Sequence, residues 1–174
     1  MLARLLRWLI LVLFMVGSGV GYGLAQWNLG PRWLTLVLAV AWPFFTLFLI
    51  VLTSMVKSRT GAPAAIWCRT LLREYIAGVH VFILRQPWTW GAPRVLAPTE
   101  TETPPRVPVL LVHGYMCNHR TWDNVSRALR AQGHTVLAVN MEPLFISIDS
   151  FAPTIDAAVA DLCQQTGCHQ VALV

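Results

Sequence analysis

Two long uncharged apolar stretches near the start of the sequence constrain its fold more than any other feature. Residues 8–25 form the first stretch and residues 33–56 the second. As helices rising 1.5 Å per residue, they would span roughly 27 and 36 Å, against an apolar bilayer core of about 30 Å. The sequence therefore predicts a two-helix transmembrane hairpin over residues 1–60, with the lipid bilayer as its partner.

The distribution of basic residues predicts the orientation of this hairpin. Two arginines precede the first stretch and four basic residues follow the second, whereas only Arg32 lies in the turn between them. By the positive-inside rule, both termini should be cytoplasmic, in an inner (cytoplasmic) membrane. A cleaved signal peptide is the alternative, because Gly-Leu-Ala at residues 23–25 resembles a cleavage site, but the apolar stretch is long for that.

Charge is divided unequally along the chain. Residues 1–95 hold nine Arg and Lys and one acid, whereas residues 96–174 hold four Arg and seven acids. The basic part adjoins the predicted membrane segment, where it suits anionic lipid head groups. Nucleic-acid binding needs basic residues interleaved with aromatic residues on a soluble surface, and the sequence lacks that pattern, so no nucleic-acid partner is expected.

Four alternate glycines within the first apolar stretch make two overlapping G-x-x-x-G pairs, Gly17 with Gly21 and Gly19 with Gly23. This pattern is typical of close helix–helix association in membranes. The glycines either associate two copies of the chain or let the first helix pack on its partner within the hairpin. The second interpretation is the favoured one.

Residues 61–92 are predicted to form a juxtamembrane amphipathic helix. Pro63 is well placed to begin it, and apolar residues recur at helical spacing up to the break at residues 86–87. Those apolar residues are Leu72, Tyr75, Ile76, Val79, Phe82 and Ile83. The helix could lie on the membrane surface or cover one face of a soluble sheet, and the two alternatives stay open.

Residues 93–106 are predicted to form a Pro-rich linker. Prolines frame a polar, acidic run at residues 99–103, and this composition cannot bury a core. The linker would separate the membrane part from residues 107–174.

Residues 107–174 alternate between apolar runs and helical patterns. Continuous apolar runs at residues 109–112, 135–139 and 171–174 are typical of parallel strands that are covered on both faces. A helix is expected over residues 121–131, with Thr121 as its N-cap and Gly133 as its terminator. A second helix should open at Ser150 or Thr154 and stop at Gly167. Together these elements predict an α/β fold with a partial parallel sheet of about three strands.

Within this part, one motif resembles a known family. His113-Gly114 follows a buried strand, and after a loop Thr121-Trp122-Asp123 stands at a helix start. This order is similar to that of bacterial lipases and esterases of the α/β-hydrolase family. The resemblance implies that residues 107–174 are the N-terminal portion of that fold, with the third strand beside the first. It also implies a G-x-S-x-G nucleophile motif after that strand, and the 174 residues contain none.

The resemblance also implies roles for the loop after the first strand. The backbone N–H of Tyr115, with Met116 as its neighbour, would stabilise an oxyanion, while His113 and Gly114 would shape the loop. The substrate would be a carboxylic ester or a lipid, and no cofactor is expected. The catalytic serine, acid and base would lie beyond Val174, so the chain is expected to be inactive by itself.

A non-catalytic membrane protein is the alternative, with the hydrolase-like part as an interaction module or a degenerate remnant. Ser147 lacks the flanking glycines of a nucleophile elbow, and Cys117 and His119, two residues apart in a loop, are expected to be solvated neighbours rather than a thiol–imidazole pair. Cys163, Cys168 and His169 match no zinc spacing, so no metal site is predicted.

Overall fold

A computed structural model of the chain describes residues 1–27, 29–58, 61, 63–99 and 106–174. The chain divides into two compact units. One is a helical unit, Arg4–Pro87, and the other a sheet unit, Trp88–Val174 together with Met1–Ala3. Each unit is described here by itself.

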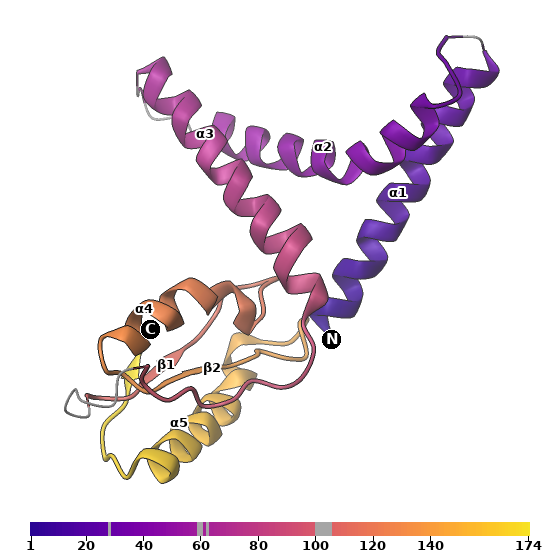
Figure 1. Ribbon diagram of the computed structural model, residues 1–174. Helices are drawn as coiled ribbons and strands as arrows, with labels where there is room; N and C mark the ends of the chain where they lie inside the picture. Colours follow the sequence, from indigo (N-terminus) through magenta and orange to yellow (C-terminus); the bar gives the residue numbers. More distant parts are fainter. Residues whose placement is uncertain (28, 59–60, 62, 100–105) are drawn as a thin grey trace. The chain divides into compact units, whose positions relative to one another are not determined.

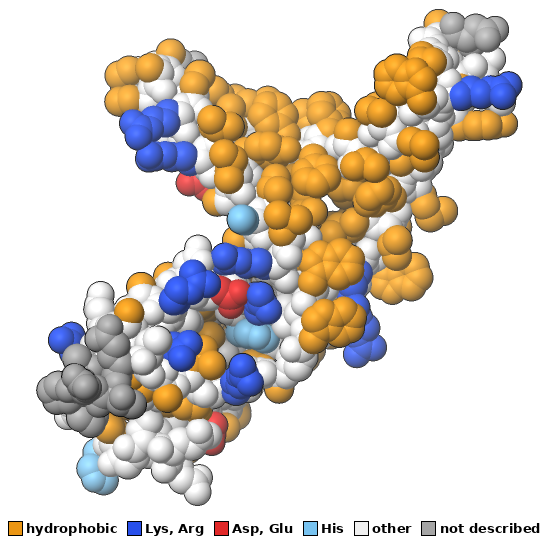
Figure 2. All heavy atoms as spheres, viewed as in Figure 1, with side chains coloured by type: hydrophobic (Ala, Val, Ile, Leu, Met, Phe, Trp, Pro, Cys, Tyr) orange, Lys and Arg blue, Asp and Glu red, His pale blue; other side chains and the backbone are white. Residues whose placement is uncertain are grey.

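The two predicted apolar stretches are helices. Helix α1 covers Leu2–Gln26 and helix α2 covers Leu34–Lys57, and both are long and apolar enough to cross a membrane. Only 11% of the most apolar window of each is buried within the protein. Figure 2 shows hydrophobic side chains over the surface of these helices. An apolar surface of this extent needs a covering, and a lipid bilayer provides one.

The glycines of α1 lie on two different faces. A Cβ atom at Gly17 would lie 2.4 Å from the backbone oxygen of Leu38, and one at Gly21 would lie 2.5 Å from the Cα atom of Thr35. A Cβ at Gly19 or Gly23 would meet no described atom within 4 Å. Gly17 and Gly21 therefore serve the packing of α1 on α2, which is the favoured interpretation from the sequence.

The predicted juxtamembrane helix is continuous but changes its winding. Helix α3 covers Ala64–Gly78, begins directly after Pro63, and continues as a π-helix over Val79–Arg85 and a 3-10 turn over Gln86–Trp88. Helix α3 packs on α2, since the rings of Tyr75 and Phe48 meet edge to face with centroids 5.5 Å apart. The indole N–H of Trp67 also donates to the Met55 carbonyl at 3.4 Å. Within the helical unit, α3 is thus a partner of the apolar helix α2 (Figure 1).

The sheet unit contains a three-stranded parallel sheet in the order β2-β1-β3. Its strands are β1 at Val109–Leu111, β2 at Val136–Ala138 and β3 at Ala172–Leu173. The partial parallel sheet is the one that the sequence predicts, and its third strand does pair with its first.

Two helices cover opposite faces of this sheet (Figure 1). Helix α4, Asp123–Ala131, follows β1, and its Leu129 packs with Val109, Leu111 and Val136 on one face. Helix α5, Ala152–Thr166, follows β2, and its fully buried Leu162 packs with Leu110 and neighbouring residues on the other face. Alternate residues of β1 therefore enter two separate hydrophobic cores.

The helix stops agree with the sequence prediction and the helix starts do not. Gly133 and Gly167 adopt positive φ angles of 88° and 67° after α4 and α5, as glycine terminators do. Thr121 is not an N-cap, because a 3-10 turn over His119–Trp122 precedes α4, and the side chain of Asn118 caps that turn. Neither Ser150 nor Thr154 opens α5, which instead follows a 3-10 turn over Ile148–Phe151.

Part of the predicted linker over residues 93–106 belongs to the sheet unit. The backbone of Leu96 pairs antiparallel with Val136, through two N–H···O bonds of 2.8 and 3.0 Å. Val95 packs against the core beneath α5. Backbone pairing at the open edge of β2 explains this difference, since it needs no apolar periodicity in the sequence. Residues 100–105 lie outside the described part of the chain.

Candidate functional site

The connections of the sheet define a crevice at the carboxyl ends of its strands. The chain leaves β1 toward α4 on one face and leaves β2 toward α5 on the other. Where neighbouring parallel strands connect to helices on opposite faces, their loops separate, and ligands bind in the space between them. The loop that carries His113, Gly114, Tyr115 and Met116 starts at this place.

An apolar cavity of about 530 Å³ lies in that crevice. Its walls come from the loop after β1, the loop after β2 and the start of α5. The lining residues are Val112, His113, Gly114, Tyr115, Met116, Met141, Leu144, Ile146, Ile148, Phe151 and Ile155. Predominantly apolar walls with a few polar groups at one end are typical of small-molecule sites.

His113 connects the two loops that form the cavity. The side chain is buried, and its Nε2 atom accepts a hydrogen bond from the backbone N–H of Met141 at 3.0 Å. Because Nε2 accepts, the ring proton is on Nδ1, which lies 2.8 Å from the carbonyl oxygen of Gly114. Both ring nitrogens are therefore engaged, and His113 has no free nitrogen to act as a general base.

Burial also holds His113 in its neutral form. Loss of solvation lowers the pKa of the imidazole below its ordinary value of 6.5, and this outweighs the Gly114 carbonyl, which favours the charged form. The neutral ring is the one that can accept from Met141, so protonation would break that hydrogen bond.

The three residues after His113 line the cavity, and their backbone N–H groups are unpaired within the described chain. In the described part of the chain, the N–H groups of Gly114, Tyr115 and Met116 have no hydrogen-bond acceptor. Met116 adopts a left-handed conformation with φ of 58°, which is uncommon for a residue other than glycine. A Cβ at Gly114 would meet no protein atom within 4 Å, so this residue borders open space. Unpaired N–H groups beside an apolar cavity form a site where an oxyanion could be stabilised.

The exposed ring of Tyr115, which lines the cavity, contacts the ring of Phe145. Tyr115 is 70% exposed and Phe145 is 67% exposed, and their rings meet at a centroid distance of 6.3 Å. Because Tyr115 follows β1 and Phe145 follows β2, this contact joins the same two loops as His113 does. The sequence predicted a role only for the backbone N–H of Tyr115, as an oxyanion donor. It did not indicate this contact of the Tyr115 ring.

A polar cluster that the sequence analysis missed fixes the other end of the β1 loop. The Asn140 Oδ1 atom accepts from the backbone N–H of His119 at 2.8 Å and lies 3.0 Å from the His119 Nδ1 atom. The Asn118 amide donates to the Thr89 hydroxyl at 3.2 Å. These contacts join residues far apart in the sequence, so no short sequence motif predicts them.

The structure does not assemble a catalytic triad from the described residues. No serine or cysteine there hydrogen-bonds to a histidine, and the ring of His119 contacts Asn140 rather than Cys117. Among the same residues, no group of three His, Cys, Asp or Glu side chains lies close enough together to hold a metal ion. The cavity therefore offers hydrogen-bond donors and apolar walls, without a nucleophile in reach of a base.

No protein-family model, curated protein or solved structure matches the chain. The fold and the site by themselves define a broad class of protein. It has two apolar helices of membrane-spanning length and a small parallel α/β unit with an apolar cavity at the carboxyl ends of its strands.

Proposed function

We propose that the chain is the N-terminal part of a membrane-anchored serine hydrolase of the α/β-hydrolase type, acting on carboxylic esters or lipids. The unpaired N–H groups of Tyr115 and Met116 beside an apolar cavity are the observation that carries this proposal. In acyl transfer, such donors stabilise the negative charge that develops on the carbonyl oxygen. The apolar walls suit the acyl part of an ester, and His113 holds the donor loop in place.

The topology supports the same proposal. Strand β1 is central, β3 lies beside it, and α4 and α5 cover opposite faces. The resemblance implies a third strand beside the first, and in that family the nucleophile follows the strand that corresponds to β3. The serine, its acid and its base would then come from residues after Val174.

The first test is to read the natural gene through its stop codon and to express the whole product. A Gly-x-Ser-x-Gly motif directly after β3, and labelling of that serine by a fluorophosphonate probe, are the expected results. A reading frame without a serine nucleophile would refute the hydrolase proposal and favour a non-catalytic interaction module.

A pair of substitutions at Tyr115 then tests the oxyanion role in that product. Tyr115→Pro removes the backbone N–H and should lower kcat by about 10²- to 10³-fold. Tyr115→Ala keeps the N–H and removes only the exposed ring, so kcat should remain close to that of the wild type. Equal losses of kcat in both variants would show that the side chain, not the N–H, is what matters.

We further propose that both termini face the cytoplasm and that the α1–α2 turn faces the other side of an inner membrane. Arg32 is the only basic residue of that turn, whereas basic residues flank the hairpin elsewhere. Leu29 in the turn is 68% exposed, so Leu29→Cys can report its location. A membrane-impermeant maleimide should label this variant in intact cells, in a background with the four native cysteines replaced by serine. If labelling requires permeabilised cells, the α1–α2 turn faces the cytoplasm and the proposed orientation is wrong.

A further inference from the structure

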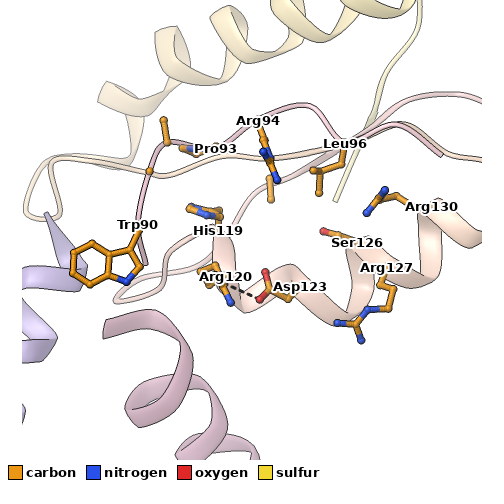
Figure 3. Close-up of a pocket in the computed structure, with 13 residues that line it drawn as sticks. Trp90, Pro93, Arg94, Leu96, His119, Arg120, Asp123, Ser126, Arg127 and Arg130 are labelled. Atoms are coloured by element: carbon orange, nitrogen blue, oxygen red, sulfur yellow. Dashed lines mark hydrogen bonds and ion pairs between the residues drawn. The ribbon is translucent and has the colours of Figure 1, made fainter. Parts of the chain in front are cut away.

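The sheet unit contains a second cavity, of a different chemical character. It has a volume of about 570 Å³ and lies between residues 90–96 and helix α4. Figure 3 shows Trp90, Pro93 and Arg94 on one wall, and His119, Ser126 and Arg130 on the other. We refer to this cavity as the basic groove, because four arginines line it.

The charges of the basic groove are not balanced. The lining arginines are Arg94, Arg120, Arg127 and Arg130, and among the described residues Asp123 is the single acid that lines it. Arg120 is already paired with Asp123, since its Nε atom lies 2.8 Å from the carboxylate. Within the described residues, no carboxylate lies in ion-pair distance of the other three arginines. Clustered guanidinium groups without counter-charges create a positive potential that attracts anions.

The walls of the groove are held by a backbone bridge and by a side-chain hydrogen bond. Leu96 pairs with Val136 at the edge of the sheet, which fixes the segment that carries Arg94. The Arg130 Nε atom donates to the Ala97 carbonyl at 2.6 Å, which joins the two walls. The basic groove is thus largely formed before any ligand arrives, and pre-formed sites lose less entropy on binding.

We propose that the basic groove binds a phosphate group. Guanidinium groups present paired N–H donors that match phosphate oxygens, and several of them together suit a group with more than one negative charge or more than two acceptor oxygens. Ser126, which is 4% exposed, adds a hydroxyl at the floor of the groove. The volume falls in the range of roughly 300–1,000 Å³ that is typical of small-molecule sites, so a phosphate with an organic substituent fits.

The phosphate has two sources with the same chemistry, a phospholipid head group or a soluble phosphate ester. The apolar helices of the chain make the first source accessible, and the exposure of Arg94 makes the second accessible. This proposal does not depend on the hydrolase proposal, because none of the residues that line the basic groove lines the apolar cavity.

Arg94 is the residue to substitute, because it is exposed and makes no hydrogen bond or ion pair with the rest of the described chain. Arg94→Gln should therefore leave the fold unchanged, as an unaltered circular dichroism spectrum would show. Arg106→Gln is the matched control, since it removes the same charge from an exposed position of the sheet unit outside the basic groove.

The experiment has two arms that use the full chain. In detergent, inorganic phosphate and glycerol phosphate are titrated by calorimetry, and Arg94→Gln should weaken binding about tenfold while Arg106→Gln has little effect. In nanodiscs, hydrogen exchange of residues 91–96 is compared between phosphatidylcholine and phosphatidylglycerol. Slower exchange only with phosphatidylglycerol, lost in Arg94→Gln, identifies a lipid head group as the source.

Binding of soluble phosphates that Arg94→Gln weakens, or slower exchange with phosphatidylglycerol that Arg94→Gln abolishes, supports the proposal. Which of the two is observed identifies the source of the phosphate. The proposal is overturned if neither soluble phosphates nor phosphatidylglycerol affect the groove. It is also overturned if Arg94→Gln and Arg106→Gln weaken binding equally, because a general charge effect would then explain the result.

Discussion

Leucines of the helical unit and of the sheet unit have opposite surroundings. In α2, Leu36 is 72% exposed, whereas Leu110 and Leu111 of β1 are fully buried between two helices. The sheet unit covers its apolar side chains with its own helices, as a water-soluble fold must. The helical unit leaves them on its surface, which is stable only where the surroundings are themselves apolar.

Polar groups differ between the two units in the same way. In α1 and α2, the hydroxyls of Ser18, Thr46 and Thr53 all donate to the carbonyl four residues earlier, so these three groups are satisfied within their own helices. In the sheet unit, Thr166 makes the same kind of bond within α5, but other polar side chains join different segments, as Asn140 does with His119. Helices that satisfy their hydrogen bonds internally are suited to lipid, and long-range polar contacts are suited to fixing loops around a site.

The sharpest comparison applies one substitution to both units. Leu110→Ala should lower the free energy of unfolding of the sheet unit by about 2–5 kcal/mol, because it removes packing from a fully buried position. Leu36→Ala in α2 should change the stability in lipid by less than about 1 kcal/mol, since an exposed side chain leaves no cavity. Hydrogen exchange of β1 and α2 amides in nanodiscs measures both. Similar losses at the two positions would contradict the assignment of lipid as the surroundings of α2.

A second prediction concerns the one place where the helical unit is tightly packed. Gly17→Val should separate α1 from α2, because its Cβ would overlap backbone atoms of α2, and the expected loss of stability is about 1–3 kcal/mol. Gly19→Val is the matched control, because open space surrounds that position. Cysteine cross-linking between α1 and α2 in the membrane should decrease only in the first variant. A larger effect of Gly19→Val would indicate that its face packs on a second copy of the chain.

The sequence predicted the parts of the molecule that local patterns determine. The apolar stretch at residues 8–25 lies within α1, the stretch at residues 33–56 matches α2 to within one residue at each end, and each predicted strand contains the observed one. Glycine marked both helix ends in the sheet unit because positive φ is a local property of the residue. The predicted helix starts were wrong, since 3-10 turns precede both helices and Asn118 supplies the cap.

The sites were less predictable because they depend on contacts between distant segments. Leu96 lies among prolines without any strand pattern, and only the exposed edge of β2 explains its pairing. The basic groove was missed because residues 96–174 carry more acids than bases, and a net charge hides a local cluster such as Arg120, Arg127 and Arg130. His113 to Met116 lie together at the cavity as their adjacency requires, while their roles in catalysis remain predictions.

The third prediction tests the helix start that the sequence misplaced. Asn118→Ala should destabilise the sheet unit by about 1 kcal/mol or more, because it removes both the cap to the Arg120 N–H and the contact with Thr89. Thr121→Ala should cost less than about 0.5 kcal/mol, since its hydroxyl caps nothing in the described chain. Thermal unfolding of the two variants in detergent compares them directly. A larger loss for Thr121→Ala would restore Thr121 as the cap.

The smallest expected effect is a pH dependence of the stability of the sheet unit that arises from His113. Burial lowers the pKa of His113 in the folded state, so below the ordinary value of 6.5 the unfolded chain binds a proton that the folded chain does not. Stability should therefore be independent of this group above about pH 7.5 and should fall as the pH is lowered through about 6.5. Denaturation of the protein between pH 5 and 8, monitored by hydrogen exchange of the Leu110 amide, measures how the free energy of unfolding changes with pH. His113→Gln should remove this pH dependence, whereas His169→Gln, at an exposed position, should retain it. If the pH dependence of stability persists in His113→Gln, another group binds the proton. The hydrogen bond between His113 and Met141, which joins the β1 and β2 loops, would then not be the source of the pH dependence.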